Sequence, residues 1–118
     1  MAYLNIRPVA QGEIEFWAVS EDHFDGAEVT AMEPKGPHFI IAHSEQGHHH
    51  VLDREVAEVS TVKNSIGMEM LRVIVKAPTE VKNLNPHGHK NLPLTPGIYE
   101  ARISREMGLD DVIRSSRD

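Results

Sequence analysis

The sequence predicts an all-β fold, either a small β-barrel or a β-sandwich, with a short irregular or helical tail at its C-terminus. About six short segments are rich in β-branched and aromatic residues, and several alternate between apolar and polar positions as half-buried strands do. Turn residues such as Asp25-Gly26 and Pro34-Lys-Gly-Pro37 separate these segments. Many short strands separated by turns are typical of sandwiches and barrels. We expect one β domain over residues 1–105 and the tail over residues 106–118.

The expected strands follow from local patterns along the chain. We expect an edge strand over 3–9 because Pro8 suits an edge, and further strands over 13–19, 27–31, 39–42, 48–53, 68–76 and 98–105. A short extended piece begins near Val81. Residues 56–64 leave two alternatives open: Val56, Val59 and Val62 are spaced by three as in a helix, whereas their β-branching favours a strand.

The expected strands over 13–19 and 98–105 each indicate which of their faces is buried. In the strand over 13–19, Ile14, Phe16 and Ala18 alternate with Glu13, Glu15 and Trp17. In the strand over 98–105, Tyr99, Ala101 and Ile103 form the expected core face, opposite Ile98, Glu100, Arg102 and Ser104. Trp17 is the single tryptophan, and we expect it to pack at the core or at an edge.

Length and composition exclude several classes of protein. The chain has 118 residues, enough for one core, and no stretch approaches the roughly 20 apolar residues of a membrane span. Its N-terminus lacks the basic and apolar regions of a signal peptide. The net charge of −6 disfavours nucleic-acid binding, and the absence of cysteine fits a reducing cytosol. We therefore expect a cytoplasmic protein with neither nucleic acid nor membrane as its partner.

A histidine-rich segment over 39–55 is the main candidate site. The apolar run 39–42 predicts a strand, Gln46-Gly47 a two-residue hairpin turn, and 48–53 the returning strand. This register places His43 opposite His50 and Glu45 opposite His48. All four side chains would then share one face of the hairpin with the apolar side chains of Phe39, Ile41 and Leu52. His49 and Ser44 would then point to the other face.

The chemistry of this segment points to a metal. Neutral imidazole is a ligand for zinc, nickel and iron, and two histidines at alternate strand positions can converge on one ion. We expect His43, His48 and His50 to hold a divalent transition metal, with Glu45 as a further ligand or as the catalytic base toward metal-bound water. The alternative is a histidine-rich surface hairpin that holds no specific metal.

The other histidines are expected to play lesser roles. His87-Gly88-His89 predicts a solvated loop that could also cap the site or add a ligand. His23 and His38 stand alone beside turn residues, and we expect both at the surface.

Two resemblances follow from these motifs. His48-x-His50 with Glu55 resembles the first motif of the cupins, and Leu94-Thr-Pro-Gly-Ile-Tyr99 resembles the Pro-Gly turn of the second, although Ala42 replaces a motif glycine. The stretch from His43 to His50, together with Pro96-Gly-Ile-Tyr-Glu-Ala-Arg102 and Arg105-Glu106, is similar to a set of small uncharacterised phage and bacterial proteins. The second resemblance implies no activity.

These observations lead to two function hypotheses. The first is a cytosolic, cupin-like metal-binding protein with metal-dependent chemistry on a small molecule. The second is a phage or prophage accessory or structural protein, located in the host cytoplasm or the virion, in which the histidine cluster stabilises the fold or the interface of a homo-oligomer. An open coordination position beside a pocket would favour the first hypothesis, and a saturated or shared site would favour the second.

Overall fold

The computed structural model describes residues 3–4, 7–11, 14–43, 49–64, 66–83 and 91–103. Within these ranges the chain forms two antiparallel sheets and no helix, so the all-β prediction is confirmed. The sheets do not close into a barrel. No described helix is long and apolar enough to cross a membrane. The expected tail over 106–118 lies outside the described residues.

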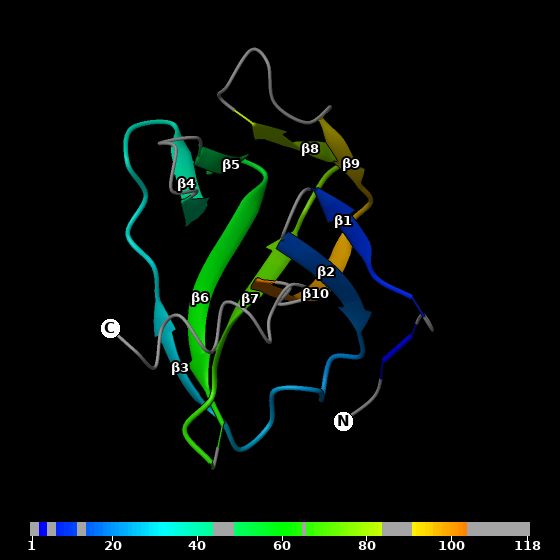
Figure 1. The fold of residues 1–118 in the computed structure, drawn as a ribbon, viewed down its shortest axis with the longest axis vertical. Helices are drawn as coiled ribbons and strands as arrows, with labels where there is room; N and C mark the ends of the chain where they lie inside the picture. Colours follow the sequence, from blue (N-terminus) through cyan, green and yellow to red (C-terminus); the bar gives the residue numbers. More distant parts are fainter. Residues whose placement is uncertain are drawn as a thin grey trace, which may run out of the picture.

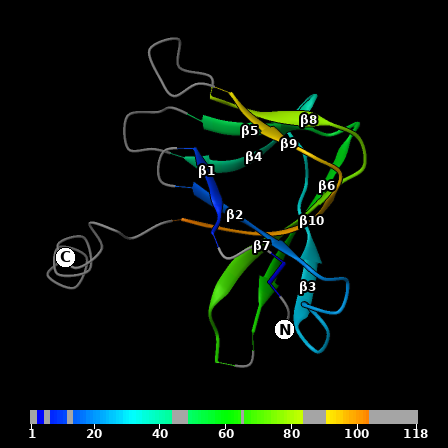
Figure 2. The same ribbon diagram turned by 90° about the vertical axis from the view of Figure 1, so that its right-hand side faces the viewer.

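The larger sheet has six strands in the spatial order β1-β2-β10-β7-β6-β3. Their bounds are Val9–Gln11 (β1), Ile14–Val19 (β2), Glu28–Ala31 (β3), Ala57–Lys63 (β6), Glu69–Val75 (β7) and Gly97–Ile103 (β10). The smaller sheet has the order β4-β5-β8-β9, with bounds His38–His43 (β4), His49–Asp53 (β5), Thr79–Asn83 (β8) and Leu92–Leu94 (β9). The smaller sheet lies across one end of the larger sheet (Figures 1 and 2).

Two sequence-based expectations are refined by this topology, and one edge strand contains a proline. Residues 57–63 form strand β6, so the choice left open for 56–64 falls on a strand. The expected edge strand over 3–9 is displaced: Tyr3 makes one isolated bridge to Val19, and the edge strand β1 begins at Val9. Pro93 lies in β9 at the edge of the smaller sheet. An edge strand tolerates proline, because the missing N–H is not needed for a hydrogen bond between strands there.

The main core lies between the two sheets. It consists of buried apolar side chains from both layers, namely Ile14, Phe16, Phe39, Ile41, Ala42, Leu52, Ala57, Val59, Val73, Val75, Val81, Leu94, Tyr99 and Ala101. The expected inward positions of β2 and β10 are confirmed for Ile14, Phe16, Tyr99 and Ala101, whereas Ile103 is exposed. Burial of apolar area between two sheets is the dominant stabilising term for a layered β fold.

A second apolar cluster lies on the opposite face of the larger sheet. It contains Val19, Phe24 and Val62, and Trp17 packs against it as expected for a residue beside the core. Residues 20–27, which connect β2 to β3, fold in successive turns and bring Phe24 onto this face. Part of the outer face is therefore covered, and polar side chains on it become buried.

Candidate functional site

The described residues cover part of the predicted histidine hairpin. Residues 44–48, which include Glu45 and His48, lie outside the described residues. His87 and His89 also lie outside the described residues. The structure describes the pairing of β4 with β5 on either side of this gap. Metal binding by His43, His48 and His50 and a catalytic role for Glu45 therefore stay predictions.

The register of the hairpin differs from the predicted one. His43 pairs with His49, and His50 pairs with Ala42, so the predicted pairing of His43 with His50 is wrong. A two-residue turn requires an even number of residues between paired positions, whereas five residues, 44–48, separate His43 from His49. A bulge between Ile40 and Ala42 adds an extra residue to β4 and shifts the register by one further residue toward the start of that strand. A period-two count along the sequence cannot contain such an extra residue.

His50 is held in one orientation by Gln11. His50 is 2% exposed, and its Nδ1 lies 2.8 Å from Oε1 of Gln11, a residue of β1 in the other sheet. Nε2 of Gln11 donates to the carbonyl oxygen of Val81 at 3.0 Å. Because that carbonyl only accepts, the Gln11 amide turns its oxygen toward His50, and Nδ1 of His50 is the donor. In the neutral ring the lone pair is then on Nε2.

A second polar cluster, which we call the Glu100 cluster, consists of Tyr3, His23, Glu100 and Arg102 on the outer face of the larger sheet. Nε2 of His23 lies 2.7 Å from Oε1 of Glu100, and each of these two side chains is 3% exposed. The Tyr3 hydroxyl donates to the same oxygen at 2.9 Å. Nε of Arg102 lies 3.5 Å from the other oxygen, Oε2. The expectation that His23 lies at the surface is therefore wrong.

Aromatic rings enclose this cluster. The Tyr3 ring meets the rings of Trp17 and His23 edge to face, at centroid distances of 5.4 and 4.7 Å. Phe24 meets His23 in the same way at 4.8 Å, and the Arg102 guanidinium lies 5.0 Å from the centroid of the Trp17 ring. Burial raises the pKa of the Tyr3 hydroxyl, and the hydrogen bond to Glu100 and the charge of Glu100 raise it further.

The sequence predicts which face of β10 carries Glu100, but not that Glu100 is buried or that it contacts His23. Alternation places Glu100 on the face of Ile98 and Arg102, opposite the core residues Tyr99 and Ala101. Such a position is usually solvated, and nothing local relates it to His23 in a turn far upstream. Glu100 becomes buried because residues 20–27 and Tyr3 cover the middle of the sheet.

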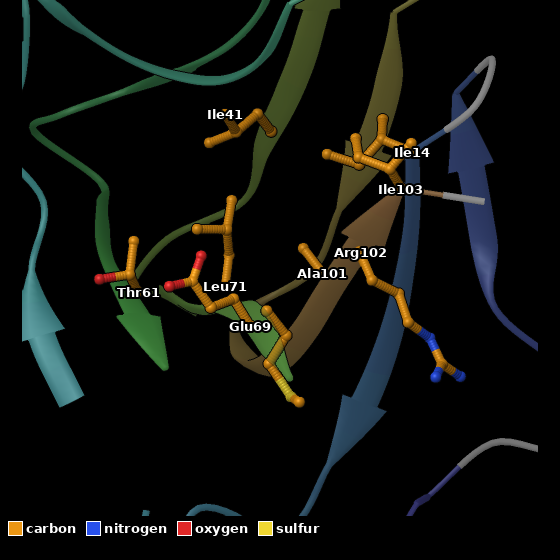
Figure 3. A pocket seen from close by; sticks show the side chains of 9 residues that line it. Ile14, Ile41, Thr61, Glu69, Leu71, Ala101, Arg102 and Ile103 are labelled. Atoms are coloured by element: carbon orange, nitrogen blue, oxygen red, sulfur yellow. The ribbon is translucent and has the colours of Figure 1, made fainter. Parts of the chain in front are cut away.

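An apolar cavity of about 180 Å³ lies between the sheets (Figure 3). Ile14, Ile41 and Leu71 surround it, whereas the Arg102 guanidinium points away from them (Figure 3). Its described lining also includes the polar residues Thr61, Glu69 and Arg102. Among the described residues, no group of three or more histidine, aspartate or glutamate side chains could hold a metal ion.

Comparison with known proteins assigns the chain to a family without assigning an activity. A family model described as a domain of unknown function (DUF8820) matches residues 10–104, which include Gln11, His50 and the Glu100 cluster except Tyr3. No curated protein and no solved structure gives a significant match.

Proposed function

The chain belongs to the DUF8820 family, a family of unknown function, and we propose that it binds a divalent transition metal at the end of the β4–β5 hairpin. Nε2 of His50 is one ligand in this proposal, and the predicted His43 and His48 supply the others. The candidate metals are zinc, nickel and iron, for which neutral imidazole is a suitable ligand.

One observation carries the proposal: the contact between Gln11 and His50. A metal-ligating histidine usually donates its other ring N–H to a carbonyl or carboxylate oxygen, which fixes the tautomer and the ring orientation. Gln11 Oε1 accepts from His50 Nδ1 in this way, and Val81 in turn orients Gln11. The arrangement prepares Nε2 to act as the ligand atom, before any ion is bound.

The proposed chemistry follows from the number of ligands. Three imidazoles leave a coordination position for water or a small molecule, and a metal lowers the pKa of bound water toward neutrality. Glu45 would serve as the base or as a fourth ligand. We place this chemistry in the cytosol because a chain without cysteine suits a reducing compartment.

The test is metal titration of the untagged protein, followed by calorimetry and by thermal melting against a chelator control. We expect Gln11→Leu to weaken zinc or nickel binding by about 10- to 100-fold, the usual cost of losing such a supporting contact. His50→Gln should abolish binding. The matched control is His38→Gln, because His38 lies at the opposite end of β4 from His43. Equal binding by wild type and His50→Gln would refute the proposal.

The observed register changes the choice of a second control. The predicted hairpin made His49→Ala a silent substitution, but His49 is the residue paired with His43. His43→Ala and His49→Ala should therefore be compared directly. If only His49→Ala weakens binding, the ion is held by a set that differs from the predicted one.

The burial of His50 supports a second candidate function. A histidine that is 2% exposed and bonded across the two sheets can stabilise the fold without a metal. This role suits a phage or prophage accessory or structural protein, in which the cluster supports the fold or a subunit interface. Under this candidate, His50→Gln lowers the melting temperature equally with zinc and with chelator.

A further inference from the structure

The Glu100 cluster borders a cavity on the outer face of the larger sheet. The cavity measures about 150 Å³, and His23, Glu100, Tyr3 and Arg102 line it together with apolar residues that include Phe24, Val62 and Met70. It lies on the other side of the larger sheet from the main core, remote from the β4–β5 hairpin. The metal proposal makes no use of it.

One atom of this cluster has an unmet requirement. Nδ1 of His23 is buried and has no hydrogen-bond partner among the described residues. A carboxylate only accepts, so Nε2 of His23 donates to Glu100, and Nδ1 of the neutral ring is an acceptor. A buried acceptor without a donor costs free energy, and such a group calls for an explanation such as a bound molecule or a functional role.

The size and the walls of the cavity indicate what could supply the donor. An engineered apolar cavity of about 150 Å³ in another protein binds benzene, so a single six-membered ring is of suitable size. Phe24 and Val62 offer apolar contact, and Met68 and Met70 offer flexible, polarisable walls. Nδ1 of His23 has almost no accessible area, so a ligand can reach it only if the wall of the cavity moves. Met68, a lining residue, is 54% exposed and unbranched, and its side chain can move.

We propose that this cavity is a binding site for a small hydroxylated ring of the size of phenol, whose O–H donates to Nδ1 of His23. Glu100 holds the imidazole in the accepting tautomer, and Tyr3 and Arg102 hold Glu100. The ring of the ligand lies against Phe24, Val62 and the two methionines. His23 is thus the residue that selects a ring with a donor over a plain hydrocarbon.

The test compares phenol with toluene, which has nearly the same shape and no donor. Titrations are followed by NMR of the methionine methyl groups and of the His23 ring nitrogens in the wild-type protein. We expect phenol to bind about threefold to tenfold tighter than toluene, the range of one net hydrogen bond, and to shift the Nδ1 resonance. Equal affinities, an unmoved Nδ1 resonance, or a site that holds water only would overturn the proposal.

A pair of variants separates the hydrogen bond from the shape of the cavity. His23→Gln retains an N–H that can donate to Glu100 but replaces the fixed Nδ1 acceptor with an amide oxygen on a flexible side chain, so the preference for phenol over toluene should fall. His38→Gln, on the other sheet, should leave that preference unchanged. Because the comparison of phenol with toluene uses wild-type protein, the proposal can be judged even if His23→Gln does not fold.

Discussion

His23 and Glu100 are 77 positions apart in the sequence, and their side chains meet at 2.7 Å in the interior. Glu100 also accepts from Tyr3 and lies beside Arg102, so three segments of the chain converge on one carboxylate. A buried carboxylate requires such partners, because burial without them strongly disfavours the charged form. The contact joins the N-terminal segment and the turns over 20–27 to the centre of the larger sheet.

Replacement of Glu100 should destabilise the protein. Glu100→Leu retains most of the side-chain volume but leaves the buried His23 donor without its acceptor, which costs about 1–3 kcal/mol of unfolding free energy. The matched control is Glu58→Leu, since the Glu58 side chain is 60% exposed and should change stability by no more than about 0.5 kcal/mol. Urea unfolding measures both variants, and similar midpoints for the two would contradict the importance of the Glu100 cluster.

The Tyr3 hydroxyl should titrate at higher pH than an ordinary tyrosine. Its pKa is raised by burial first, and then by the hydrogen bond to Glu100 and by the charge of Glu100. The folded-state pKa thus exceeds the unfolded value of about 10, so the stabilising contribution of Tyr3 is complete below that pH. It is lost as the pH rises through the folded-state pKa.

The measurement for Tyr3 is the ultraviolet absorbance of tyrosinate as a function of pH. The difference between wild type and Tyr3→Phe isolates the Tyr3 hydroxyl from Tyr99. Glu100→Gln should move the Tyr3 midpoint back toward the ordinary value, because it removes the charge beside the hydroxyl. An unchanged midpoint in Glu100→Gln would mean that burial is the sole cause.

The core between the sheets should be sensitive to the loss of single side chains. Leu52 is fully buried, so Leu52→Ala should lower the free energy of unfolding by about 2–5 kcal/mol. Ile66 is 78% exposed, and Ile66→Ala should change it by no more than about 0.5 kcal/mol. Chemical denaturation of the two variants makes the comparison, and an equal effect would show that Leu52 is not part of a packed core.

The sequence by itself determined the class of fold and the buried faces of its clearest strands. The side chains of Ile14 and Phe16, and of Tyr99 and Ala101, alternate with polar neighbours, and each of these four lies in the core between the sheets. The reason is local: successive side chains of a strand point to opposite faces, so alternation is visible in a short stretch of sequence. Trp17 packs against the second apolar cluster, although the same alternation places it on the face of Glu13 and Glu15.

Tertiary structure decided the features that depend on contacts between distant segments. The pairing of β4 with β5 places His43 opposite His49 and includes a bulge between Ile40 and Ala42. A count along the sequence shows neither feature, because the register is set by the packing of both strands. The division of the ten strands among the described residues into sheets of six and four also lies beyond local patterns. His23 resembled a solvated turn residue and Glu100 an outward strand residue, and each is buried because the other segment covers it. Burial of a polar side chain is settled by partners brought together in space, so it cannot be derived from either stretch taken separately.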